Sequence, residues 1–140
     1  VPLLISLPNQ TERHDIYAPT SCVDLLPTLL QFSDQEIPKF LQGEILPGFG
    51  SAARQVERSV YGMEAKLSNK GDPTRTCTLA MVKGRYKLIK YAGYKEGVEN
   101  ELFDLENDPE EMENLVLIKN KLAEEMGAEL MIKLEKELAR

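Results

Sequence analysis

The sequence predicts an α+β fold, in which a small antiparallel sheet of three or four strands packs against a long C-terminal helix. Between residues 58 and 105, apolar and polar residues alternate in short runs, which is the period of half-buried strands. Between 115 and 138, apolar residues recur every three or four positions, which is the period of a helix with one apolar face. A chain of 140 residues can bury roughly two thirds of its unfolded surface, enough for one core.

The N-terminal segment "VPLLISLP" is apolar between two prolines, which predicts a short strand over Leu3–Leu7 that is buried on both faces. Such a strand needs neighbours, and no other run in the chain has this character. We therefore expect Leu3–Leu7 to pair with residues outside the chain or to lie at its edge. An unpaired apolar strand is also a route by which copies of the chain can form homo-oligomers.

Residues 20–32 predict a helix that begins at Leu25 or Leu26. Pro27 then occupies the first turn, where its missing N–H costs nothing. Residues 33–53 are rich in Gly and Pro, which predicts a surface loop. The apolar face of the predicted helix comprises Val23, Leu26, Leu29 and Leu30.

After Arg58 the pattern becomes that of strands. "SVYGME" predicts the first strand, and "CTLAMVKGRYKLIKYAG" predicts two more around a turn at Lys83-Gly84. "NELFDLE" predicts the last strand of the meander. Alternation along "RYKLIKY" places Tyr86, Leu88 and Lys90 on one face of the strand. The other face then carries Arg85, Lys87, Ile89 and Tyr91.

The C-terminal segment predicts a helix with an apolar stripe of about six turns. Asp108 is the expected N-cap, with Pro109 at the first position and Glu110 and Glu111 against the positive end of the helix dipole. Gly127 costs about 1 kcal/mol relative to Ala inside a helix, so it is expected to mark a close contact or a bend. The stripe comprises Leu115, Ile118, Leu122, Met126, Leu130, Leu134 and Leu138.

The net charge of -6 is distributed unevenly along the chain. Residues 1–50 carry two basic and six acidic side chains, residues 51–100 carry ten and five, and residues 101–140 carry five and twelve. The cationic middle favours an anionic ligand over nucleic acid, because the whole molecule would repel a polyanion. The alternative is that these cations only solvate the outer face of a hairpin. No apolar run is long enough to span a bilayer, so no membrane partner is expected.

The two cysteines and the start of the chain carry little functional information. Cys22 and Cys77 match no metal-binding or Cys-x-x-Cys spacing, so two unpaired thiols are expected and not a disulfide. The chain opens without Met, a basic region or a cleavage site. We therefore read no signal peptide and interpret the start as a truncation, which leaves the compartment undetermined.

Six short segments carry a resemblance to a known family. "ELFDLENDPEEMENL" resembles the closing signature of sulfatases, in which a strand of the form Glu-Leu-Tyr-Asp-Leu runs into Asp-Pro-x-Glu and then Asn-Leu. Upstream, "VKGRYKLIKY" resembles their hairpin, "SVYGME" the strand before it, and "TSCVDLLPTLL" their helix with Asp-Leu-x-Pro-Thr. "LQGEILPG" resembles the loop that follows this helix, and "VPLLISLP" a late strand of their main sheet. Together, and in this order, the six cover nearly the whole chain.

The resemblance implies a division of the chain and a function for its parent enzyme. Residues 1–50 would be the tail end of the α/β domain of a sulfatase, within the alkaline-phosphatase superfamily, with a late strand, a helix and a loop. Residues 51–140 would be a C-terminal antiparallel subdomain with the terminal helix. The parent would be a sulfuric ester hydrolase acting on a sulfated small molecule or glycan, with the upstream catalytic domain as this chain's partner. The alternatives are a non-catalytic packing or oligomerisation module, or the C-terminal part of a related phosphodiesterase or phosphonate hydrolase.

The resemblance further implies that the parent uses calcium and a formylglycine made from Cys or Ser in Cys/Ser-x-Pro/Ala-x-Arg. The formylglycine hydrate attacks sulfur, and calcium polarises the sulfate oxygens. The residues after Cys22 and Cys77 do not fit this motif. Ser6 is followed by Pro8 but by Gln10 in place of Arg. The family's metal-binding Asp pairs have no counterpart here either. We expect no catalytic residue, metal ligand or cofactor in this chain, and no activity from it alone.

The candidate substrate-binding residues are Lys66, Lys70 and Arg75, in or beside the long loop between the first two predicted strands. The C-terminal subdomain of sulfatases borders the substrate pocket, and loops on rigid scaffolds often bind ligands. The alternative is a solvated loop. Asp24 and Thr28 also match the family pattern, but a carboxylate and a hydroxyl at a helix start are expected to anchor the helix.

Overall fold

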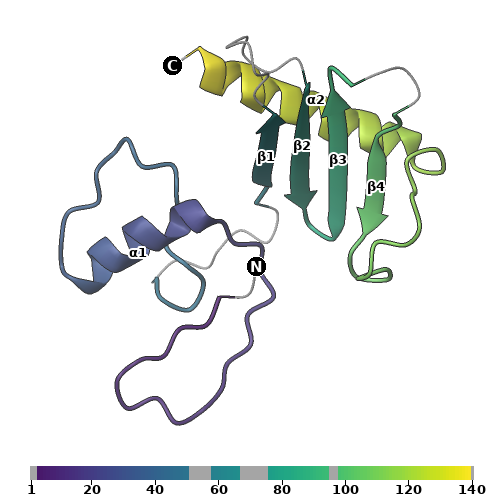
Figure 1. The fold of residues 1–140 in the computed structure, drawn as a ribbon. Coiled ribbons are helices and arrows are strands. Elements are labelled where there is room, and N and C mark those ends of the chain that lie inside the picture. Colours follow the sequence, from purple (N-terminus) through teal and green to yellow (C-terminus); the bar gives the residue numbers. More distant parts are fainter. Residues whose placement is uncertain (1–2, 51–57, 67–75, 95–97, 140) are drawn as a thin grey trace.

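The computed structural model describes residues 3–50, 58–66, 76–94 and 98–139, and it confirms the predicted α+β fold (Figure 1). A short 3-10 helix, η1 (Cys22–Asp24), leads into α1 (Leu25–Phe32). Four strands and a long helix follow: β1 (Val60–Lys66), β2 (Thr76–Lys83), β3 (Tyr86–Ala92), β4 (Glu101–Asp104) and α2 (Asn120–Leu138). Neither helix in the described ranges is both long and apolar enough to cross a membrane.

The four strands form one antiparallel sheet in the order β1-β2-β3-β4, so each strand pairs with its neighbour in sequence (Figure 1). Gly84 and Arg85 join β2 to β3, because Lys83 pairs with Tyr86. Gly84 has a φ of 56°, a conformation that Gly adopts without steric cost and that tight hairpins require. The turn therefore lies one residue beyond the predicted Lys83-Gly84.

One face of the sheet packs against α2 and forms the core, as predicted from the two periodicities. Met81 pairs with Leu88, and Leu88 pairs with Leu102, so their side chains lie on this same face. Ile118 departs from the predicted stripe, because it precedes α2 and is exposed. The buried core residues are Leu79, Met81, Leu88, Leu102, Ala123, Met126 and Leu130.

Helix α2 begins at Asn120, so the prediction that Asp108 caps it is wrong. Asp108 caps a turn instead. Its carboxylate accepts hydrogen bonds from the N–H groups of Met112 (3.0 Å) and Glu113 (2.8 Å), and these bonds lower the pKa of Asp108. Glu111 has a φ of 57°, a left-handed conformation that a continuing helix excludes.

The segment between β4 and α2 runs along the outer edge of β4. The N–H of Leu115 donates to the carbonyl of Leu102 at 2.8 Å. The N–H of Leu102 donates in turn to Asn114 Oδ1 at 3.0 Å. Buried backbone groups must find partners, and these bonds to β4 compete with a helix over the same residues. The predicted helix therefore forms only from Asn120 onward, after the residues that hydrogen-bond to the edge of β4.

Residues 3–50 form a separate lobe around α1, beside the start of β1 (Figure 1). Helix α1 begins at Leu25 with Pro27 in its first turn, as predicted. The strand predicted over Leu3–Leu7 is not formed in this chain, because a strand needs hydrogen bonds to a neighbouring strand and no described residue supplies them. Its pairing with residues outside the chain stays a prediction.

Candidate functional site

Of the three residues predicted to bind substrate, the structure describes only Lys66, at one end of the sheet. Lys66 is the last residue of β1 and pairs with Thr76, the first of β2. Lys70 and Arg75 lie outside the described residues. The antiparallel register places the end of β1, the start of β2, the end of β3 and the start of β4 at this same end of the sheet. The binding role of these three cations stays a prediction.

Four polar and aromatic side chains gather at this end of the sheet, on the face opposite α2. Thr78 in β2 is directly opposite Tyr91 in β3, and the hydroxyls of Thr78 and Tyr94 lie 3.1 Å apart. The Tyr91 hydroxyl donates to Glu101 Oε2 at 2.8 Å, and this hydrogen bond is the main cause that raises the pKa of Tyr91. The rings of Tyr91 and Tyr94 meet edge to face with centroids 5.5 Å apart. We call Thr78, Tyr91, Tyr94 and Glu101 the tyrosine cluster.

Asp24 and Thr28 anchor α1, as the sequence predicts. The side chain of Asp24 is completely buried, and its carboxylate accepts hydrogen bonds from the N–H groups of Ser21 and Glu44, each at 2.9 Å. Arg58 donates to both Asp24 oxygens, each at 2.8 Å. The Thr28 hydroxyl donates to the carbonyl of Asp24 at 2.6 Å. The buried ion pair thus ties the start of α1 to the residues that lead into β1.

Glu129 in α2 connects the helix to β1 and β2. Its carboxylate accepts hydrogen bonds from Ser59 (2.6 Å), Tyr61 (3.1 Å) and Lys83 (2.6 Å). Burial raises the pKa of Glu129, but the three hydrogen bonds and the charge of Lys83 outweigh burial and leave that pKa below its ordinary value. Burial is also the main cause that raises the pKa of Tyr61. These contacts hold α2 against β1 and β2, and we call them the Glu129 clamp.

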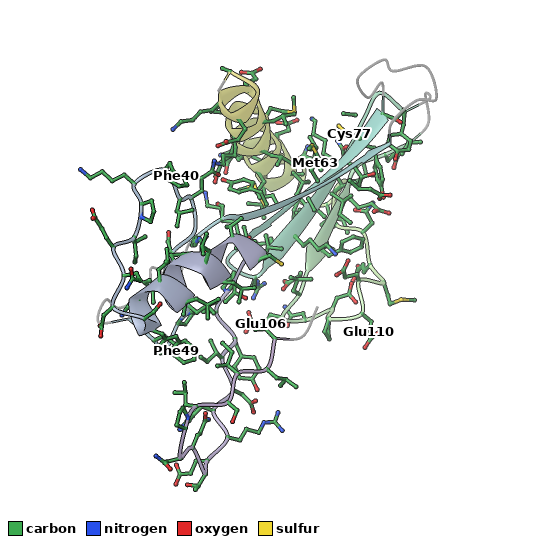
Figure 2. All side chains as sticks on the ribbon, turned by 60° about the vertical axis from the view of Figure 1, so that its left-hand side comes forward. Phe40, Phe49, Met63, Cys77, Glu106 and Glu110 are labelled. Carbon is green, nitrogen blue, oxygen red and sulfur yellow. The ribbon has the colours of Figure 1, made fainter. Side chains whose placement is uncertain are left out.

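The apolar face of α1 is uncovered in this chain. Leu26 and Leu29 are exposed, Leu29 by 61%, and so is Phe32 beyond them. Phe40 is exposed as well, and Figure 2 places it on the same lobe, away from Cys77 in the sheet. Soluble proteins rarely leave a large contiguous apolar patch in water, and such a patch marks a contact surface.

The calcium and formylglycine implied by the resemblance do not fit the described part of the chain. It contains no group of three or more His, Cys, Asp or Glu side chains that could hold a metal ion. Cys22 and Cys77 are free thiols, and neither stands in the motif from which formylglycine is made. No catalytic step is therefore derived from these residues.

The relationship of this chain to known proteins covers its full length. Residues 1–140 match the family model described as N-sulphoglucosamine sulphohydrolase, C-terminal. The chain belongs to this family. The resemblance to the C-terminal portion of sulfatases, found in six short segments, is thereby confirmed.

Two curated relatives of this family member are sulfatases. The chain is 35% identical over 117 residues to YidJ of Escherichia coli (strain K12), described as an uncharacterized sulfatase, and the match covers 83% of the chain and 22% of YidJ. It is 30% identical over 119 residues to arylsulfatase K of Xenopus laevis, which covers 82% of the chain and 22% of that protein. The chain thus spans about a fifth of the length of the curated relatives it matches.

Solved structures of sulfatases share the fold. The putative sulfatase YidJ of Bacteroides fragilis is 29% identical with a TM-score of 0.61, covering 81% of this family member and 24% of that chain. A protein in complex with its substrate D-glucosamine-2-N,6-O-disulfate is 26% identical with a TM-score of 0.50, covering 81% and 23%. The phosphonate monoester hydrolase of Agrobacterium radiobacter, at 22% identity and a TM-score of 0.61 over 87% and 26%, shares the fold alone.

The tyrosine cluster and the partner of Asp24 were not found from the sequence. Alternation did place Tyr91 on the face opposite Leu88, which is correct, but its partners come from other strands and depend on the register. Arg58 lies 34 positions from Asp24, and no local pattern links them. The one signal in the sequence was Asp24 itself, because a carboxylate at a helix start needs a partner if folding removes it from water.

Proposed function

We propose that this chain is the C-terminal part of a sulfatase, a sulfuric ester hydrolase whose nucleophile and metal ligands lie elsewhere in the same polypeptide. The observation that carries this assignment is the match of all 140 residues to a C-terminal sulfohydrolase family, by a chain that spans 22% of its sulfatase relatives. The formylglycine and calcium of such an enzyme would belong to the remaining part. The present chain would support the fold and border the substrate pocket.

Residues 1–50 would complete the α/β domain of the enzyme. The uncovered apolar face of α1 supports this role, because Leu26, Leu29 and Phe32 need a partner surface. The apolar segment Leu3–Leu7 would join the main sheet as a late strand. The ion pair between Asp24 and Arg58 would then fix the small sheet relative to α1, because Arg58 leads directly into β1.

The small sheet would present Lys66, Lys70 and Arg75 to the substrate. A cationic loop suits a sulfated ligand, because sulfate groups beyond the reacting one need counter-charges. One solved relative was captured with a disulfated glucosamine, which supports a sulfated saccharide as the substrate class. Sulfatase is favoured over phosphonate hydrolase because both curated relatives at 30% identity or more are sulfatases.

Activity measurements test this assignment. The 140-residue chain with calcium and an aryl sulfate should give no turnover, and measurable turnover would overturn our view of the chain. The longer protein that contains it should hydrolyse the aryl sulfate. Hydrolysis of a phosphonate monoester alone, or of neither ester, would favour the alternatives. Reading the residues encoded upstream of Val1 should reveal Cys/Ser-x-Pro-x-Arg and an Asp pair.

The pocket role of the cations needs its own comparison. Changing Lys66 and Lys70 to Ala in the longer protein should raise KM for a sulfated saccharide and leave kcat nearly unchanged, because uniform binding energy is lost. Lys121→Ala is the matched control, since Lys121 is a lysine on α2 whose side chain is 88% exposed. Unchanged KM in the double variant would sink the pocket role while leaving the sulfatase assignment in place.

A further inference from the structure

The outer face of the sheet carries small and aliphatic residues next to the tyrosine cluster. In the neighbouring row, Gly62, Ala80 and Ile89 follow one another across β1, β2 and β3, and Glu101 stands opposite Ile89 in β4. Gly62 has no side chain and Ala80 has only a methyl group, so both project little from the sheet. A Cβ added to Gly62 would lie 4.0 Å from Ala80 Cβ. Tyr91 and Glu101 therefore border a row of small and aliphatic groups.

The tyrosine rings add aromatic surface to this row. Because Tyr91 and Tyr94 meet edge to face at 80°, the ring that presents its edge keeps both faces clear of its partner. Tyrosine supplies a large apolar area with a polar tip, so it can contact the C–H groups of a ligand and hydrogen-bond the ligand's hydroxyls. The carboxylate of Glu101 and the hydroxyl of Thr78 are further groups of the kind that sugar hydroxyls bind.

The charge of the cluster determines which part of a ligand it can accept. Glu101 is within 2.8 Å of the Tyr91 hydroxyl, and no Lys or Arg belongs to the cluster. A sulfate placed here would face a carboxylate at close range and be repelled. A neutral sugar ring meets no such repulsion, and its hydroxyls can donate to the carboxylate.

We propose that the tyrosine cluster binds an uncharged pyranose unit of a saccharide ligand, with the ring on Tyr91 or Tyr94 and its hydroxyls on Glu101 and Thr78. If the chain is part of a sulfatase acting on a glycan, the unit bound here is an unsulfated neighbour of the reacting sugar. This origin of the saccharide rests on the proposed function, whereas the binding site itself does not. Lys66, whose backbone lies at the same end of the sheet, is one of the residues proposed above to bind sulfated units.

A binding experiment on the 140-residue chain tests the site. Titration with N-acetylchitotriose, followed by amide chemical shifts, should perturb the residues of the cluster at millimolar saccharide. Inorganic sulfate over the same range should leave them unperturbed. Tyr91→Ala and Tyr94→Ala should each weaken saccharide binding about tenfold, as expected for the loss of one well-placed aromatic contact. Tyr17→Ala, which removes a tyrosine that is 90% exposed on the N-terminal lobe, should leave binding unchanged.

The outcomes separate this site from the sulfatase assignment. Saccharide binding at the cluster without ester hydrolysis by the longer protein leaves the site in place and removes the proposed function. Hydrolysis without shifts at the cluster overturns the site alone. Equal weakening by Tyr17→Ala, or cluster shifts caused by sulfate, would also overturn it. Tyr94 lies beyond the end of β3, so Tyr94→Ala provides the test even if Tyr91→Ala fails to fold.

Discussion

Replacement of Asp24 by Asn should destabilise the chain by about 3–5 kcal/mol, the range for breaking a buried ion pair by removing one partner. Each Asp24 oxygen accepts one hydrogen bond from Arg58 and one from a backbone N–H. An amide nitrogen in place of either oxygen turns one acceptor of two hydrogen bonds into a donor that faces two donors. The variant then loses one charged hydrogen bond, worth about 1.5–3 kcal/mol, and leaves one N–H unsatisfied at about 1–3 kcal/mol.

Urea unfolding followed by circular dichroism measures this loss. With a slope of about 1–3 kcal/mol per molar urea, the midpoint should fall by at least about 1 M. Asp15→Asn is the matched control. The Arg13–Asp15 pair has the same N–O distance of 2.8 Å, but its side chains are 85% and 47% exposed. Exposed pairs contribute about 0–1 kcal/mol, so this variant should unfold almost like the wild type.

The two variants therefore separate burial from ion pairing as such. If Asp24→Asn shifts the midpoint no more than Asp15→Asn, the anchor is energetically unimportant and our reasoning fails. The double variant Asp24→Asn/Arg58→Met adds a second check. It removes a guanidinium that is only 14% exposed and that keeps only the longer contact to Glu44, at 3.6 Å, once Asp24 is neutral. The double variant should therefore be more stable than Asp24→Asn alone. Additive losses would show that Asp24 and Arg58 do not act as a pair.

Three further predictions concern α2 and its surroundings. Gly127→Ala should raise the free energy of unfolding by about 0.5–1 kcal/mol in urea, because its Cβ would meet Leu88 Cδ2 at an ordinary 3.8 Å. Gly43→Ala is the contrasting case and should be strongly destabilising, since a Cβ there would lie 1.9 Å from the carbonyl oxygen of Val23. Glu129→Gln should lower stability at pH 7 and converge with the wild type in acid. The pKa of Glu129 in the fold lies below its ordinary value of 4.5, so the ionised carboxylate stabilises the fold at pH values above 4.5. This contribution is lost as the pH falls through the folded-state pKa. If the stabilities of variant and wild type ran parallel with pH, the clamp would be contradicted. Asn114→Ala should cost about 1–3 kcal/mol in thermal or urea unfolding by leaving the N–H of Leu102 without its acceptor, and a neutral result would mean that water replaces Asn114.

Most of the fold could be predicted because its signals are local. The period of two in β2 and β3 and the spacing of Met126 and Leu130 in α2 are written in neighbouring residues. Pro27 likewise fixes where α1 can begin. The sheet and α2 bury their apolar faces against each other inside the chain, so pattern and structure agree for these elements.

The differences arise where distant groups compete with a local pattern. Asp108 and Pro109 form a good helix start, but hydrogen bonds to Leu102 hold the following residues along β4. Leu3–Leu7 has the composition of a strand, yet pairing depends on a neighbouring strand that none of the described residues supplies. The candidate site shows the same limit. Lys66 could be proposed as a binding residue from its position near a predicted loop. The contact between Tyr91 and Glu101, in contrast, follows only from the register of the strands.

The covered edge of β4 limits how copies of this chain could assemble. Leu102 has both of its outward backbone groups occupied by residues 114 and 115, so β4 presents no template to an incoming strand there. β1, at the opposite end of the sheet order, has a strand neighbour on one side only among the described residues. If two copies pair through β1, the resulting sheet ends in β4 on both sides. Pairing through the edges of this sheet then closes at a symmetric dimer.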